Sequence, residues 1–244
     1  MELTPANAPV VVMLFLITLL LLAGGCVAAA ALAWRGRRRA ALRIAEALGV
    51  IVLLYAGALL THSWTSQDQL LEPGQLKYLC EVDCHLAYSV QGVRVENEIA
   101  GGLPRPSSAR LLIVSLKTWF DPRSISSRRG NGPLRPNPRA IVMEDASGRT
   151  YRVAAAAEKR LEGDANPRRL LQRSLRPGES YVTELAFEAP PRPVETRLLI
   201  SEDVPEAAFI ISHENSLLHK KTWFRIPAPP EATAPSASSA PPSR

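Results

Sequence analysis

The side chains best suited to chemistry lie in the run Cys-Glu-Val-Asp-Cys-His, where two thiols stand four positions apart and a histidine follows the second. Thiolate and imidazole groups suit copper, so Cys80, Cys84 and His85 are candidate metal ligands, and His213 or His219 would supply a further imidazole. A haem-attachment motif has two residues between its cysteines where this run has three. The spacing therefore does not fit haem, and no cofactor is expected.

The two cysteines have two further interpretations, a disulfide in an oxidising compartment or a pair of buried core thiols. In a straight strand their Cα atoms would lie ~13 Å apart, beyond the ~7 Å limit for a bridge, and His85 would point away from both. A joint site requires the chain to bend around Val82 and Asp83. The sequence leaves the disulfide Cys80-Cys84, the core thiols and the metal or redox site open.

The other candidate residues are weaker. His213 and His219 flank a predicted loop before the last strand, where histidines are typical surface or hydrogen-bonding residues. The chain has no Ser/His/Asp order, glycine-rich phosphate loop or paired carboxylates, so we predict that it is not an enzyme. The pairs at 119–120 and 223–224 each join a tryptophan to a phenylalanine, which favours core packing over contact with a partner.

Two long apolar segments near the start of the chain precede the region that contains the candidate residues. Residues 9–34 are uncharged, and residues 44–64 carry a charge only at Glu46. Both exceed or match the ~20 residues that a helix needs to cross a hydrocarbon core of ~30 Å. Each ends in a tryptophan, Trp34 or Trp64, as interfacial aromatic residues do. We predict two transmembrane helices in contact with the lipid bilayer.

Five arginines lie between these segments, in residues 35–43. The positive-inside rule predicts that this short loop is cytoplasmic, which puts the N-terminus and everything after Trp64 outside the membrane. The loop accounts for much of the formal net charge of +6. The remainder of the chain has mixed charge, which excludes a nucleic-acid-binding surface.

The outer region has the patterns of an all-β module. A polar tether is predicted at residues 65–76, a β-sandwich at 77–226 and a disordered Pro/Ala/Ser tail at 227–244. Apolar residues alternate from Tyr78 to Val90, which predicts one strand with a bulge at Gly92. The other predicted strands are a doubly buried run at 111–116, a hairpin of 139–144 with 149–154, and segments 181–187, 197–201, 207–212 and 222–226.

One helical segment is predicted within the sandwich. Asn166 is a good N-cap, Pro167 suits the first helical position, and Pro177 and Gly178 would end a helix over residues 167–175.

Three of these segments carry a resemblance. The hairpin at 145–151, the run 175–180 that leads to 187–190, and the early run 111–116 resemble telokin-like, immunoglobulin-like extracytoplasmic domains of unknown function in bacterial membrane-anchored and secreted proteins. The resemblance covers about residues 77–226. It implies a sandwich outside the membrane and no shared catalytic residue.

The leading hypothesis is a two-pass protein of the bacterial plasma (inner) membrane. Its outer, periplasmic domain would be a binding or scaffolding module for an envelope protein partner, through sheet edges or loops, and the helices themselves are expected to pack through small residues. The alternative is a copper-handling or thiol-redox protein that uses Cys80, Cys84 and His85.

Overall fold

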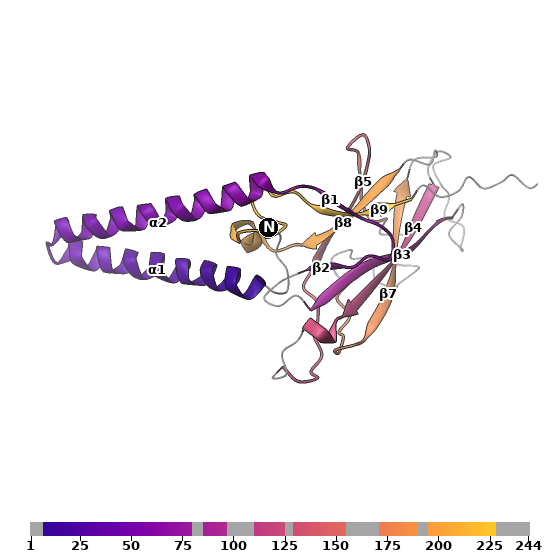
Figure 1. Ribbon diagram of the computed structural model, residues 1–244, viewed down its shortest axis with the longest axis horizontal. Helices are drawn as coiled ribbons and strands as arrows, with labels where there is room; N and C mark the ends of the chain where they lie inside the picture. Colours follow the sequence, from indigo (N-terminus) through magenta and orange to yellow (C-terminus); the bar gives the residue numbers. More distant parts are fainter. Residues whose placement is uncertain are drawn as a thin grey trace, which may run out of the picture.

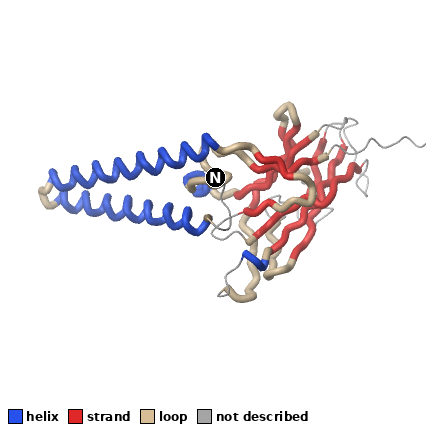
Figure 2. The backbone as a smooth tube through the Cα atoms, viewed as in Figure 1, coloured by secondary structure: helices blue, strands red, loops and turns tan. Residues whose placement is uncertain are grey.

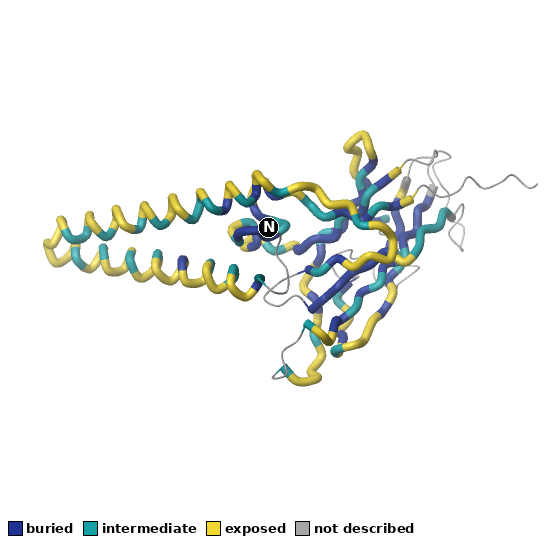
Figure 3. The backbone as a smooth tube through the Cα atoms, in the orientation of Figure 1, coloured by how far each residue is buried: buried dark blue, intermediate teal, exposed yellow. Residues whose placement is uncertain are grey.

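The computed structural model describes residues 7–79, 85–96, 110–124, 129–154, 171–189 and 195–227. Two long helices extend from one side of a domain built from β-strands (Figures 1 and 2). The helices are α1 (Ala8–Trp34) and α2 (Arg38–Thr65), and both are long and apolar enough to cross a membrane by length and composition. Their side chains are mostly exposed, whereas the buried residues concentrate between the strands (Figure 3).

A tight turn joins the two helices. Gly36 occupies the left-handed region with φ +76°, and α2 begins at once at Arg38. The prediction of an arginine-rich loop over residues 35–43 is therefore wrong in extent, because arginine, alanine and leucine favour a helix and only the glycine interrupts it. About three helical turns away from this turn the helices pack closely: a Cβ at Gly25 would lie 2.6 Å from Leu48 Cδ2.

The strands form two sheets. In the five-stranded sheet the order is β1-β9-β8-β5-β6, and in the four-stranded sheet it is β2-β3-β4-β7. The first sheet contains β1 (Gln69–Leu71), β5 (Arg139–Asp145), β6 (Thr150–Tyr151), β8 (Thr196–Glu202) and β9 (Thr222–Ile226). The second contains β2 (Lys77–Leu79), β3 (Leu86–Glu96), β4 (Arg110–Phe120) and β7 (Ser180–Ala189).

One core fills the space between the sheets. It joins residues of both, among them Tyr88, Leu116, Met143, Ile200 and Phe224, all fully buried. The predicted two-sheet sandwich is thus confirmed. The prediction for the run 111–116 is confirmed as well, because β4 is flanked by β3 and β7 and has buried residues on both of its faces.

The strand predicted from Tyr78 to Val90 is wrong. Leu79 pairs with Leu86 in the antiparallel ladder of β2 and β3, so the chain reverses direction between them. The face of β2 is also the opposite of the one expected, because Lys77 and Leu79 are its buried residues. Alternation misled here since a lysine counts as exposed unless its partners are known. The predicted bulge is confirmed: the β3–β4 register shifts between Val90 and Gly92.

The predicted tether is partly a strand. Residues 69–71 form β1, which pairs in parallel with β9, so that the last strand of the domain holds the segment that follows α2. A three-residue strand carries too little pattern to be seen in the sequence.

Three further predictions need correction. Residues 207–212 are not a strand: they include the end of the 3-10 helix η2 (Pro205–Phe209) and the turn that follows it. Proline at its start fixes φ for a turn. No helix covers 171–175, since Leu175 bridges to Leu134, while 155–170 lie outside the described residues. The strand after the hairpin is only β6, because Val153 already bridges to Phe187 of the other sheet.

Candidate functional site

Of the residues predicted from the cysteine run, the structure describes His85, whereas Cys80 and Cys84 lie outside its described residues. His85 is buried, its Nδ1 lies 3.0 Å from Ser124 Oγ, and its ring stacks on Phe120 with centroids 5.6 Å apart. These contacts are typical of a histidine that holds a loop against the core. The disulfide, the core thiols and the metal or redox site stay predictions.

A carboxylate beside His85 organises the same end of the four-stranded sheet. Asp121 accepts hydrogen bonds from the Arg123 side chain at 3.1 Å and from Tyr78 Oη at 2.7 Å, and its backbone N–H donates to the His85 carbonyl. The hydrogen bond from Arg123, and then that from Tyr78, lower the pKa of Asp121 to about 2. This carboxylate is fully engaged by its own neighbours, so we assign it to structure.

The two histidines named as further ligands lie in the chain between η2 and β9. His213 Nδ1 accepts the Asn215 backbone N–H at 2.9 Å, so its proton is on Nε2, which faces Glu202 Oε2 at 3.4 Å. His219 Nδ1 donates to the Lys220 carbonyl at 2.7 Å. The described part of the chain contains no group of three or more His, Cys, Asp or Glu side chains that could hold a metal ion.

A pocket of about 300 Å³ lies on the outer face of the five-stranded sheet, where sequence analysis predicted no site. It is positioned by register. Glu144 of β5 is the cross-strand partner of Arg197 of β8, which in turn pairs with Arg225 of β9, and β1 contributes the neighbouring edge. The lining residues are Asp68, Gln69, Leu70, Glu144, Asp145, Ala146, Glu195, Thr196, Arg197, Trp223 and Arg225.

An aromatic ring forms part of this pocket's lining. The guanidinium of Arg197 lies 4.1 Å from the centroid of the Trp223 ring, a cation–π contact. The tryptophan is buried, yet its indole Nε1 has no hydrogen-bond partner in the described residues. Phe224, its neighbour, points the other way into the core. The prediction that both rings pack in the core is thus correct for Phe224, whereas Trp223 contributes to the outer face.

The ion pairs around the pocket differ in tightness. Arg197 donates to Glu144 at 2.9 Å, whereas its distance to Asp68 is 4.0 Å. Arg225 Nε lies 3.5 Å from Glu195 without forming a hydrogen bond. The Asp68 and Glu195 side chains are 46% and 65% exposed, so their oxygens can accept further donors.

Asp145 also lines the pocket but serves the hairpin turn. It accepts hydrogen bonds from the Ser147 hydroxyl and backbone, from the Arg149 N–H and from Tyr151 Oη. The Ser147 and Tyr151 hydrogen bonds hold the pKa of Asp145 at about 2.

The chemistry of the pocket follows from this inventory. Four carboxylates and two guanidinium groups line it, so its net charge is negative. The Trp223 ring and Leu70 add apolar surface to its lining. Such a lining suits a ligand with a cationic group on an apolar stem, such as a lysine or arginine side chain.

No protein-family model matches the chain, and neither does any curated protein. Solved structures show a distant likeness. The secreted protein MPT63 of Mycobacterium tuberculosis is 11% identical, with 66% of this chain and 100% of MPT63 covered at a TM-score of 0.40. A β-sandwich protein of Clostridium difficile 630 is 10% identical, covering 66% and 95% at 0.37.

The Bacillus subtilis protein ycdA is 10% identical at a TM-score of 0.38, with 63% of this chain covered. The chain spans only 38% of the length of ycdA. At such identities and TM-scores the likeness is too distant to transfer a site or an activity.

Proposed function

We propose that this chain is a membrane-anchored binding module, and not an enzyme, whose sandwich captures a basic, extended segment of an envelope protein. Support comes from one observation: a pocket with a surplus of carboxylates adjoins β1, the edge strand of the five-stranded sheet. An edge strand offers unpaired backbone groups to an extended peptide, and pockets beside it select alternate side chains.

The anchor in this proposal consists of α1 and α2 crossing the plasma membrane. Arg35 and Arg37 in the turn, with Arg38, Arg39 and Arg43 at the start of α2, would hold this end in the cytoplasm. The sandwich would then lie outside, as an extracytoplasmic domain of the immunoglobulin-like kind. Trp64, which is 86% exposed at the end of α2, suits the outer interface.

The orientation can be tested with trypsin added to intact spheroplasts. We expect cleavage after Arg149 and Arg173, which are exposed and lie outside the strands, and protection of the arginines between the helices. Cleavage between the helices with an intact sandwich would reverse the proposed topology.

The binding site can be tested on the full chain in nanodiscs of zwitterionic phosphatidylcholine. The probe is an alternating lysine–valine peptide with blocked ends, and its affinity is measured by calorimetry. We expect Asp68→Asn/Glu195→Gln to weaken binding about tenfold, since two partly exposed charge pairs contribute up to about 1 kcal/mol each. A glutamate–valine peptide should not bind.

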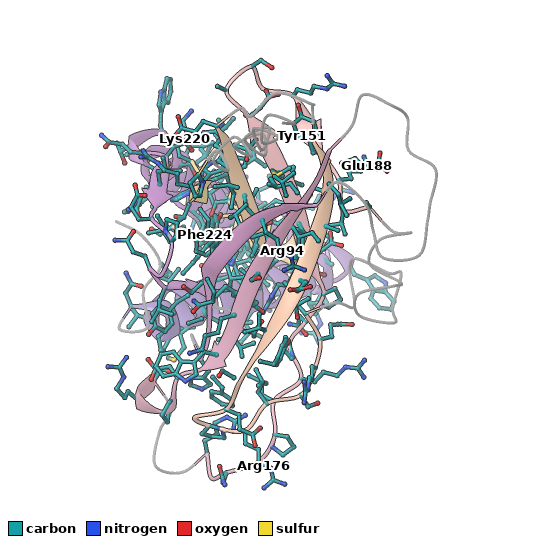
Figure 4. The ribbon with its side chains drawn as sticks, turned by 90° about the vertical axis from the view of Figure 1, so that its right-hand side faces the viewer. Arg94, Tyr151, Arg176, Glu188, Lys220 and Phe224 are labelled. Atoms are coloured by element: carbon teal, nitrogen blue, oxygen red, sulfur yellow. The ribbon has the colours of Figure 1, made fainter. Side chains whose placement is uncertain are left out.

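The matched control is Glu188→Gln. Glu188 is an exposed glutamate of β7 on the other sheet, and Figure 4 shows it apart from Phe224 of β9. Equal loss of affinity in the control and in the double variant would contradict the proposed pocket.

A further inference from the structure

The chain between β8 and β9 runs alongside α2, away from the sandwich. We name residues 203–221 the junction loop. Its contacts with α2 form a series in which each pair lies further from the sandwich than the one before. The pairs are Lys220 N–H to Ser66 Oγ at 2.9 Å, Ser212 Oγ to His62 Nδ1 at 3.4 Å, and Tyr55 Oη to the Phe209 carbonyl at 2.8 Å.

This series places the tip of the junction loop beside the apolar part of α2. Tyr55 lies nine residues before Trp64, or about 13 Å along the helix axis. The two buried residues of α2, Leu59 and Ser63, lie on the same face as Tyr55. Tyr55 also contacts Phe15 of α1, with ring centroids 6.5 Å apart, and Figure 1 shows the loop between the separated ends of the two helices.

Irregular backbone at membrane depth must satisfy its own polar groups. The junction loop does this for many of its polar groups, although His219 Nε2 is buried without a hydrogen-bond partner among the described residues. Ser216 Oγ donates to the Ile210 carbonyl, Asn215 Nδ2 donates to the Glu202 carbonyl at 2.7 Å, and Lys221 Nζ donates to the Glu214 carbonyl at 2.6 Å. Backbone hydrogen bonds from the N–H groups of Ile210, His213, Ser216 and His219 close successive turns, and the Leu217 N–H donates across the loop to the Ala208 carbonyl.

Three outward side chains of the same loop are large and apolar, beside the exposed polar residues Asp203, Glu206 and Lys220. Phe209, Leu217 and Leu218 are 56%, 50% and 70% exposed. Leu218 has φ +63°, an uncommon conformation for a branched residue that is costly to maintain. The loop thus combines hydrogen-bonded polar side chains in its interior with three large apolar side chains exposed on its surface.

We propose that the junction loop is a lipid-facing wedge, in which Phe209, Leu217 and Leu218 enter the acyl region of the outer leaflet beside α2. The proposal rests on the proposed membrane crossing by α1 and α2. Continuity with these helices identifies lipid as the occupant, because the loop already lies against the apolar stretch of α2. Glu206, exposed in η2, limits the depth, since its carboxylate stays in the headgroup layer.

The wedge would seat the sandwich directly on the membrane instead of on a flexible stalk. An interfacial segment of this kind lies about 5–10 Å into the boundary between headgroups and acyl chains. The pocket on the five-stranded sheet would then hold a fixed orientation to the membrane.

The test uses the full chain in phosphatidylcholine vesicles, with one added tryptophan whose emission is obtained as the difference from the unmodified chain. The variants are Leu218→Trp in the wedge, Leu20→Trp within α1, and Ser147→Trp in the hairpin turn remote from the membrane. Quenchers are dibrominated phosphatidylcholine in the bilayer and iodide in the water. We expect the lipid quencher to remove most of the emission added at positions 218 and 20, and iodide to remove that at 147.

Other outcomes separate the two proposals. If the tryptophan at 218 is quenched by iodide while that at 20 is quenched by lipid, the wedge is wrong and the membrane crossing stands. If neither quencher reaches position 218, protein covers the loop and the lipid contact is wrong. If iodide quenches position 20, the crossing itself fails.

Discussion

The buried pair Lys77–Glu214 and the half-exposed arginines of the pocket both join a cation to a carboxylate. The buried pair stabilises the fold, whereas the pocket arginines leave carboxylates available to a ligand. Lys77 Nζ donates to Glu214 at 2.7 Å and to the carbonyls of Ile200 and Thr222 at 2.8 and 2.6 Å. In this way a lysine of one sheet ties together two strands of the other. The pocket arginines contact carboxylates that are partly exposed to water, from 20% at Glu144 to 65% at Glu195. Burial and saturation of the hydrogen bonds therefore distinguish a structural ion pair from one available to a ligand.

The largest expected effect tests the buried member of this comparison. Lys77→Met should lower the free energy of unfolding by about 3–5 kcal/mol, because two carbonyls lose the lysine and the Glu214 carboxylate keeps only the Thr222 N–H at 3.3 Å. The measurement is denaturation of the full chain in detergent, followed by near-ultraviolet circular dichroism. The double variant Lys77→Met/Glu214→Met should lose less free energy of unfolding than Lys77→Met alone. An equal or greater loss in the double variant would show that the carboxylate is not the cause.

A smaller effect concerns Asp145, the pocket carboxylate that behaves as a structural group. Its pKa of about 2 lies below that of an unfolded aspartate, about 4, so its ionised form stabilises the fold above pH 4. This stabilisation is lost as the pH falls from about 4 to about 2. Asp145→Asn should therefore lower Tm at pH 7 and make Tm fall less steeply with pH over this range. Some pH dependence of Tm should remain, because Asp121 also has a lowered pKa. An unchanged slope would contradict the assignment.

The smallest effect on stability is expected at the pocket. Arg197→Met should cost about 1 kcal/mol, since a partly exposed ion pair and a cation–π contact each contribute at most about that much. Affinity for the lysine–valine peptide should rise, because a competing cation is removed from Glu144 and Asp68. Denaturation and calorimetry measure the two effects. A loss of affinity would show that Arg197 itself holds the ligand.

Sequence patterns predicted the strands best where one face is buried and turn signals flank them. Residues 222–226 are β9 as predicted, and 197–201 differ from β8 by one residue at each end. The hairpin of β2 and β3 was missed because apolar alternation continues through a reversal of the chain. At 207–212 the apolar residues pack in turns that depend on contacts with α2.

The pocket could not be predicted because its residues come from four strands. Only register brings Leu70 next to Trp223, and Glu144 next to Arg197. The outward position of Trp223 was the one available signal, since it alternates with Thr222, Phe224 and Ile226. The cysteine run drew attention by residue type alone, and its histidine contacts a serine and a phenylalanine.

The parallel pairing of β1 with β9 also imposes an order of events. Gln69, just beyond the helices, meets Thr222, near the end of the sandwich, so this contact closes a loop that contains nearly the whole domain. Contacts so distant in sequence form late, after their intervening strands. A newly synthesised chain would thus keep its helices loosely connected to the sandwich until its final strand had been made and had paired with β1.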